Sequence, residues 1–299
     1  MAEKHSFLDP EAISRGEILG MMARRVVEGY RVGEHRSPFR GFAIEFAQHR
    51  EYVPGDDVRH LDWKVLGRSD RYYIKQYEQD TNYVAHVLLD GSMSMNYGST
   101  DVTKLHFGKA LAACLSYLIL SQRDAVALAL FDTETREYLP RTDSLGKIHH
   151  IMNRLAAFAA NEGTQIGRAV EQISHKARSR GIVIIISDVF DDEAGLSQAL
   201  QLLRFSGHEA ILFHVLDPHE LTFPFTGTWS FLGLEQETKV QTSPAAIRKS
   251  YLANFDAFRE RVRSTCERFN THYVLADTGK SLAEVLSGYL AFRRIVGKK

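Results

Sequence analysis

The chain has 299 residues and a formal net charge of zero, because 37 lysines and arginines balance 37 aspartates and glutamates. Hydrophobic residues make up 44% and charged residues 25% of the sequence, which is ordinary for a globular protein with a sizeable core. The balanced charge excludes the strong basic field with which proteins usually attract nucleic acid or anionic lipid.

Neither a disulfide framework nor a membrane anchor is expected. Cys114 and Cys266 are the two cysteines, too few for several disulfides or a four-thiolate zinc site, so we expect ordinary structural thiols. Residues 1–14 lack the apolar core of a signal peptide. The longest apolar run, at residues 110–120, is too short to cross a bilayer. These features predict a soluble, cytoplasmic protein.

Residues 1–81 are predicted to form an N-terminal part that differs from the rest. From Pro10 to about Gly29, apolar residues recur at roughly helical spacing among charged ones, which predicts a helix. From Tyr30 to Asp80 the pattern loosens and ends in a strand-like run at residues 72–77. We interpret this stretch as a small β-containing segment.

From residue 82 to residue 299, strands and helices are predicted to alternate in a second domain. Apolar strands are expected at residues 83–90, 125–131, 181–187, 209–216 and 272–276, with a short neighbour at 136–140. Helices are expected at residues 102–121, 144–160, 166–179 and 196–205 and from 281, with a long polar helix after a less regular insertion at about 217–243. Near-continuous apolar strands between amphipathic helices indicate an α/β fold with a doubly wound, mostly parallel sheet.

Polar side chains follow the strand ends where such a sheet binds ligands. The string Asp90-Gly91-Ser92-Met93-Ser94 follows the first strand of this domain, Thr164 precedes the helix at residue 166, and Asp188 follows the strand at 181–187. If these strands are neighbours, two carboxylates and three hydroxyls converge. Such oxygen ligands suit Mg²⁺ or Mn²⁺ and are poor for zinc or copper. The sequence therefore predicts a metal site formed by Asp90, Ser92, Ser94, Thr164 and Asp188.

Each of these residues also has a purely structural interpretation. Asp90 and the two serines could satisfy backbone donors in a turn, and Thr164 could cap the helix that follows it. Asp188 could favour the positive ends of nearby helices. The acidic residues at 191–193 are expected to be first-turn acids of the next helix and not further ligands.

The predicted metal site resembles the metal-ion-dependent adhesion site of von Willebrand factor A-like domains. Upstream, the segments Gly41–Phe46, Arg50–Lys64 and Tyr73–Glu78 resemble the signature of the domain of unknown function 58 family. The similarity extends from about Gly41 to Leu216. It implies a von Willebrand factor A-like, Rossmann-type three-layer fold, preceded by the N-terminal helix and the small β-containing segment.

The resemblance also implies roles for the site residues. The three hydroxyls would contact Mg²⁺ or Mn²⁺ directly, and the two carboxylates would act largely through water. Two departures concern the loops: Met93 and Val189 stand where many adhesion domains have glycine. They imply a narrower or differently shaped entrance to the site.

Charges of alternating sign follow the Pro54-Gly55 turn of the signature. We interpret them mainly as an ion-pair network that fixes the segment to the main domain, with Trp63 as a packing anchor. The alternative is a partner-docking surface formed by Arg50, Asp56, Asp57, Arg59, Asp62 and Trp63.

The resemblance implies a protein-interaction module and not an enzyme. Relatives accompany AAA+ ATPases of the MoxR type, so the expected partners are such an ATPase and a client protein that offers an acidic residue, in chaperone-like maturation. The sequence contains no P-loop, no G-x-G-x-x-G after a strand and no G-x-S-x-G string. Two alternatives stay open: a Mg²⁺-dependent hydrolase or phosphatase that uses the same oxygens, and a metal-free scaffold that docks through residues 50–68.

Overall fold

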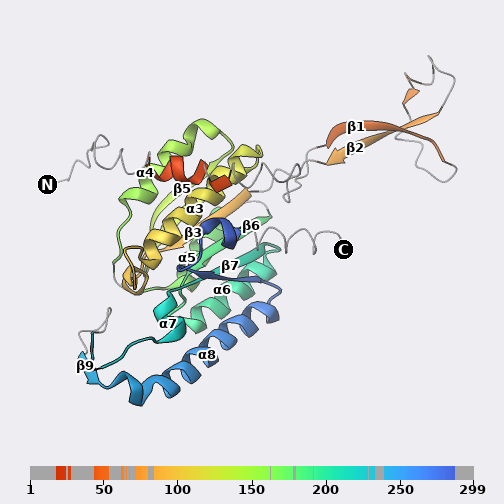
Figure 1. Cartoon of the computed structure of the whole chain (residues 1–299). Helices are drawn as coiled ribbons and strands as arrows, with labels where there is room; N and C mark the ends of the chain where they lie inside the picture. Colours follow the sequence, from red (N-terminus) through yellow and green to blue (C-terminus); the bar gives the residue numbers. More distant parts are fainter. Residues whose placement is uncertain are drawn as a thin grey trace. The chain divides into compact units, whose positions relative to one another are not determined.

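A computed structural model places the elements of the chain (Figure 1). It describes residues 18–24, 26–27, 44–53, 62, 63, 65, 67, 72–79, 84–161, 163–177, 180–190, 192–227, 229–232 and 239–286. The chain divides into two compact units, one of residues 37–83 and one that combines residues 1–36 with 84–299. Residues 1–36, which the sequence pattern groups with the signature segment in residues 1–81, thus belong to the larger unit. Ala23 and Val27, in the helical stretches 18–24 and 26–27, are buried, which accounts for the place of these stretches in the larger unit.

The smaller unit contains an antiparallel pair of strands, β1 (Ile44–Glu51) and β2 (Tyr73–Gln79). The register shifts between Phe46 and Gln48, which marks a bulge. Beyond the pair, Tyr52 N–H donates to Tyr72 O over 2.9 Å. The predicted small β-containing segment is therefore confirmed.

The larger unit is built on a six-stranded sheet. Its strands are β3 (Val84–Asp90), β4 (Ala125–Phe131), β5 (Thr135–Thr142), β6 (Gly181–Ser187), β7 (Glu209–Leu216) and β10 (His272–Asp277). Their order is β10-β7-β6-β3-β4-β5, and only the β4–β5 pair is antiparallel. The chain leaves β3 for β4 on one side and later returns to β6 on the other, so the order reverses between β3 and β6. The predicted doubly wound, mostly parallel sheet is confirmed.

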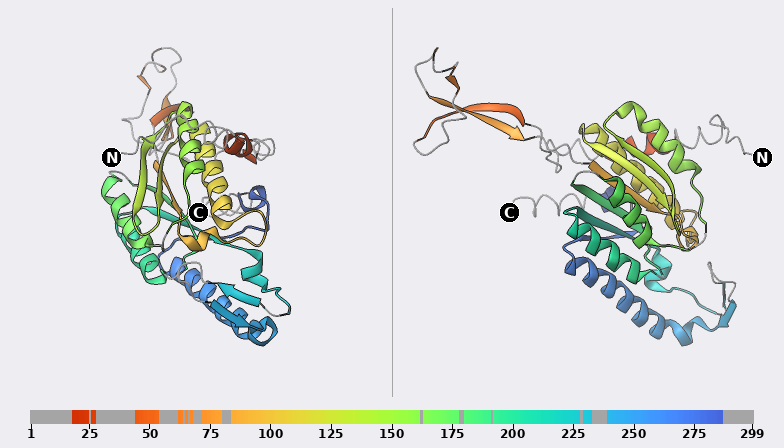
Figure 2. Two further views of the ribbon diagram at one scale, coloured as in Figure 1. Left: turned by 90° about the vertical axis from the view of Figure 1, so that its left-hand side faces the viewer. Right: turned by 180° about the vertical axis from the view of Figure 1, so that it is seen from behind.

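Helices cover both faces of this sheet, which gives the predicted three layers (Figure 2). One face carries α3 (Lys104–Ser121) and α4 (Ile148–Ala157), and the other carries α5 (Ile166–Lys176), α6 (Glu193–Phe205) and α8 (Pro244–Arg268). Gly108 allows α3 to approach the sheet, because a Cβ there would lie 2.9 Å from Leu89 Cδ1. The predicted helix at residues 144–160 is shorter in the structure, where the 3₁₀-helix η3 (Leu145–Lys147) precedes α4.

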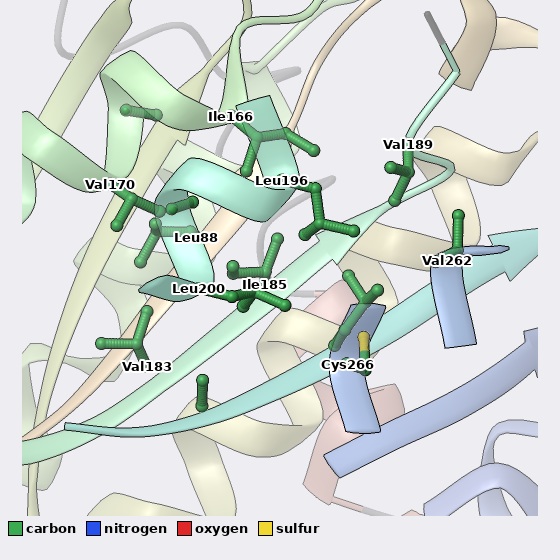
Figure 3. Packing of buried hydrophobic residues seen from close by; sticks show 14 of the residues in the cluster. Leu88, Ile166, Val170, Val183, Ile185, Val189, Leu196, Leu200, Val262 and Cys266 are labelled. Carbon is green, nitrogen blue, oxygen red and sulfur yellow. The ribbon is translucent and has the colours of Figure 1, made fainter. Parts of the chain in front are cut away.

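Alternating strand residues form the core on the α5–α6–α8 face (Figure 3). Leu88, Val183 and Ile185 point to this face and pack against Leu196 and Leu200 of α6. Each of these side chains is at most 1% exposed. Because successive strand side chains point to opposite faces, Leu89 and Ile186 pack on the α3 side instead. Central strands buried on both faces explain the continuous apolar runs in the sequence.

The insertion after β7 is more regular than the sequence predicted. It contains the short helix α7 (Pro218–Thr222) and a hairpin of β8 (Trp229–Leu232) and β9 (Lys239–Thr242). Phe223 ends α7 with a positive φ of 46° and stacks on Tyr251 of α8 at 4.3 Å between ring centroids. This insertion is held by contacts between aromatic rings, and its sequence lacks the periodic pattern from which strands are predicted. The hairpin was therefore not predicted.

The structure also bears on the two cysteines and on the expected lack of a membrane-spanning helix. Cys114 and Cys266 are buried free thiols, as predicted. Within the described ranges, no helix combines the length and the apolar character needed to cross a membrane.

Candidate metal centre

The predicted site residues follow the two strands where the sheet reverses its order. β3 and β6 pair in parallel, with Leu89 opposite Ile186, so the residues after both strands meet at the same edge. Asp90, Ser92 and Asp188 show no exposed surface there, and Ser94 shows 8%. This is the carboxyl edge at a topological switch point, the usual ligand site of such sheets.

The loop after β3 turns sharply around the Asp90 carboxylate. Ser92 N–H donates to Asp90 Oδ1 over 2.9 Å, and the 3₁₀-helix η2 (Met93–Asn96) begins directly afterwards. This turn brings the hydroxyls of Ser92 and Ser94 within 3.0 Å of each other. Gly91 is required by the neighbouring ring, since a Cβ there would lie 2.3 Å from the Phe158 ring. The D-x-S-x-S spacing therefore orients both hydroxyls toward one point.

Two more hydroxyls reach the second oxygen of Asp90. Thr164 Oγ1 donates to Asp90 Oδ2 over 2.9 Å, and Ser187 Oγ donates to the same oxygen over 2.5 Å. The interpretation of Thr164 as a helix cap is wrong, because Gln165 is the N-cap of α5 and makes no side-chain cap bond. Asp192 instead accepts from Ile166 N–H over 2.7 Å at that helix start.

Asp188 connects the site to α3. Its Oδ1 accepts from Ser94 Oγ over 3.1 Å, and its Oδ2 accepts from Lys104 Nζ over 2.7 Å. The next residue, Val189, has a φ of 59°, a left-handed conformation that is strained for a β-branched side chain. Val189 is buried in the core on the α5–α6–α8 face.

Of the acidic stretch after Asp188, Glu193 is confirmed as a first-turn acid of α6, and Asp192 lies one position earlier, at the N-cap. Asp192 is the N-cap of α6, and its side chain accepts from Gly195 N–H over 3.0 Å. Glu193 lies in the first turn of the same helix. Asp191 lies outside the described residues. Asp192 therefore accepts hydrogen bonds at the starts of both α5 and α6, and neither described acid contacts Asp90 through a hydrogen bond given for the described residues.

The electrostatics of the cluster reflect two carboxylates buried side by side. Burial, and then the nearby charge of Asp188, raise the pKa of Asp90 to about 7. Burial alone would lower the pKa of Lys104, but Asp188 and Glu220 together raise it above its usual value. Lys104 is therefore a charged ammonium group. A positive charge close to both carboxylates would relieve the cost of burying Asp90.

The donor set fits a hard divalent cation. All five predicted residues belong to one hydrogen-bonded network and offer oxygen atoms only. Within the described ranges, no group of three or more histidine, cysteine, aspartate and glutamate side chains could hold a metal ion. The candidate centre thus consists of two carboxylates supplemented by hydroxyls, a combination that suits Mg²⁺ or Mn²⁺ and not zinc.

The proposed docking residues of the signature are only partly described. Arg50 lies on β1 opposite Ile74, and Asp62 accepts from Val65 N–H through Oδ1 at 3.3 Å. Asp56, Asp57 and Arg59 lie outside the described residues. Trp63 is 67% exposed, and its predicted role as a packing anchor remains a prediction.

Three participants were missed in the sequence. Ser187 was read only as the end of a strand, and Lys104 only as part of a helix. Lys104 could have been suspected, because a lysine in the first turn of an apolar helix opposes the helix dipole. Glu220 follows Asp217-Pro218 at the spacing of a capping box, which is present in the structure. Its contact with Lys104 depends on tertiary structure.

Fold and site together define an α/β domain with a carboxylate and hydroxyl cluster at its switch point. The chain belongs to the family described as "Protein of unknown function DUF58", whose sequence model matches residues 48–261. Similar proteins include uncharacterized proteins of Mycobacterium tuberculosis and Mycobacterium bovis. Each is 24% identical over 222 residues, which cover 73% of this chain and 69% of the relative.

Solved structures with similarity to the chain include three proteins. The conserved hypothetical protein BatB from Bacteroides thetaiotaomicron has a TM-score of 0.45 and 16% identity over 71% of this chain and 98% of that one. An aerotolerance-related membrane protein from Bacteroides fragilis has a TM-score of 0.47 and 18% identity, over 70% of this chain and 98% of that one. The SpRpn10 VWA domain has a TM-score of 0.40 and 16% identity, over 68% of this chain and 93% of that one.

Proposed function

We propose that this protein is a metal-dependent protein-interaction module and not an enzyme. The observation that carries the proposal is the convergence of three hydroxyls and two carboxylates on one buried network at the switch point. A Mg²⁺ or Mn²⁺ ion held by Asp90, Ser92, Ser94, Thr164 and Asp188 would supply an open ligand position for an acidic side chain of a partner protein.

The hydrogen bonds of Asp90 argue against a phosphatase that uses this residue as its nucleophile. Its Oδ1 accepts from Ser92 N–H, and its Oδ2 accepts from both Thr164 and Ser187. The side chain is also completely buried. A carboxylate nucleophile needs a free oxygen that faces the substrate, whereas a carboxylate that orients hydroxyls does not.

The family resemblance extends the proposal to the partner. We propose that a MoxR-type AAA+ ATPase binds this module, and that a client protein with an accessible Asp or Glu is matured by the pair in a chaperone-like manner. The metal centre would then make client or ATPase capture dependent on the divalent ion.

The metal centre is tested first on the purified protein by Mn²⁺ titration calorimetry. The Ser92→Ala/Ser94→Ala variant should lose at least about 100-fold in Mn²⁺ affinity, because two direct ligands are removed. The matched control is Ser174→Ala/Ser250→Ala, which removes two helix-surface hydroxyls that bond to their own helix backbones. Equal affinities in both double variants would contradict the site.

Partner capture is tested by co-purification with a MoxR-type ATPase from the same cell, in Mg²⁺ and in EDTA. We expect capture in Mg²⁺ only, and loss of capture for Ser92→Ala/Ser94→Ala. Equal capture in both buffers would refute the ion bridge and favour docking through residues 50–68. Turnover of phosphoesters that Asp90→Asn abolishes would refute the non-enzymatic assignment.

A further inference from the structure

Lys104 is a fully buried cation beside the candidate metal centre, and no sequence pattern assigns it to a site. Its side chain is 1% exposed. Its ammonium group lies 2.7 Å from Asp188 Oδ2 and 2.7 Å from Glu220 Oε1. A buried lysine is rare unless it is paired, and this one is paired twice.

The position is unfavourable for a positive charge apart from those two carboxylates. Lys104 opens α3, and the start of a helix carries a partial positive charge that repels cations. Its neighbours on two sides are aromatic rings, with Nζ 4.7 Å from the Phe190 centroid and 5.8 Å from that of Tyr97. The charge is therefore held by the pair of acids, with a smaller contribution from the ring faces.

The two carboxylate oxygens of Asp188 have different partners. Oδ2 binds Lys104, which leaves Oδ1 with Ser94 in the metal centre. Glu220 uses its other oxygen, Oε2, to accept from Asp217 N–H over 2.8 Å, as part of the capping box of α7. Lys104 thus joins the metal centre to the start of the insertion through one chain of contacts.

We propose that Lys104 and Glu220 form an internal counter-ion pair that orients Asp188 and sets the affinity of the metal centre for divalent cations. This inference rests on the proposed metal site and deepens it. Lys104 lowers the negative charge offered to an ion, and Glu220 offsets part of the lysine's charge. Removing the two members of the pair should therefore shift metal affinity in opposite directions.

The expected signs follow from Coulomb interactions in a buried site. Lys104→Met removes a positive charge and should tighten Mn²⁺ binding about tenfold or more. Glu220→Gln is isosteric, leaves Asp188 as the single carboxylate paired with the lysine, and should weaken binding by a similar factor. The double variant should return to within a few-fold of the natural protein. Lys109→Met, the same chemical change further along α3, is the control and should alter affinity less than about twofold.

The experiment is Mn²⁺ titration calorimetry of the full chain at pH 8, with folding of each variant checked by circular dichroism. Opposite shifts in the two single variants support the inference. Weaker binding in both, or unchanged binding in both, would overturn it, because a merely structural pair would give one of these results. If Lys104→Met does not fold, Lys104→Gln, which removes the same charge, takes its place, and opposite shifts relative to Glu220→Gln are still required.

Failure of the proposed function gives a different pattern. If the natural protein binds no Mn²⁺ at millimolar concentration, the proposed ion-bridged function fails. In that case Lys104→Met must acquire measurable binding for the counter-ion role to stand, because the lysine would then take the place of the ion. Absence of binding in both proteins overturns the function and the inference together.

Discussion

His86 shows how a single buried side chain makes stability depend on pH. It lies on β3 and is 4% exposed, and its Nδ1 has no hydrogen-bond partner in the part of the chain that the structure describes. Burial, and then the neighbouring His208, lower the pKa of His86 from 6.5 to about 4. The folded protein therefore keeps this imidazole neutral at pH values where the unfolded chain would bind a proton.

The first prediction follows from that difference. Because the pKa is lowered on folding, the contribution of His86 is fully present above pH 6.5 and is lost as the pH falls toward 4. Between pH 7.5 and pH 5 the free energy of unfolding should fall by about 2 kcal/mol through this residue. Urea denaturation of the natural protein and of His86→Leu at both pH values measures the difference. An equally steep loss in the variant would contradict the assignment.

Helix starts provide a comparison at the level of elements. Thr103 is the N-cap of α3, and its side chain accepts from His106 N–H over 3.1 Å. Ser243 is the N-cap of α8 in a similar extended conformation, but its side chain makes no cap hydrogen bond. The two helices therefore begin with the same type of residue and differ in whether the hydroxyl satisfies a free backbone donor.

The second prediction uses this pair. Thr103→Ala should lower the free energy of unfolding by about 1 kcal/mol, because one backbone N–H at the start of α3 loses its acceptor. Ser243→Ala should change it by less than about 0.5 kcal/mol. Chemical denaturation of both variants at pH 7.5 provides the measurement. A larger loss for Ser243→Ala than for Thr103→Ala would show that the caps do not govern these helix starts.

The stability of the larger unit as a whole depends mainly on apolar side chains buried between its layers. Ile185 has no exposed surface and lies in the middle of the cluster formed by the sheet, α5, α6 and α8 (Figure 3). Phe205, at the end of α6, is larger but 91% exposed. Comparing the two side chains shows how much of an apolar residue's contribution to stability depends on its being buried.

The third prediction contrasts these residues. Ile185→Ala should cost about 2–5 kcal/mol, because it removes a buried side chain and leaves a cavity between packed layers. Phe205→Ala should change the free energy of unfolding by less than about 0.5 kcal/mol. Guanidinium denaturation monitored by circular dichroism measures both. A cost for Phe205→Ala that approached that of Ile185→Ala would indicate that the exposed ring is covered in solution.

The sheet and the main donors were predictable because they depend on local and periodic features. Fully buried strands have continuous apolar runs, so residues 84–90, 125–131 and 181–187 were found nearly to the residue. Asp90, Thr164 and Asp188 were then expected to meet by the rule for switch points, and they do. The β8–β9 hairpin was missed, because Trp229 and Phe231 pack on Phe223 and Phe225, the aromatic residues just after α7, and these contacts leave no periodic pattern.

The sequence by itself therefore determined the doubly wound sheet and placed oxygen-bearing side chains at its switch point. Periodicity and D-x-S-x-S spacing act over a few residues and can be read directly from the chain. Only the tertiary structure decided that the Thr164 hydroxyl donates to Asp90 instead of capping α5, and that Lys104 lies between Asp188 and Glu220. These contacts join residues 74 to 116 positions apart, and the cost of burying a charge depends on neighbours that no local pattern specifies.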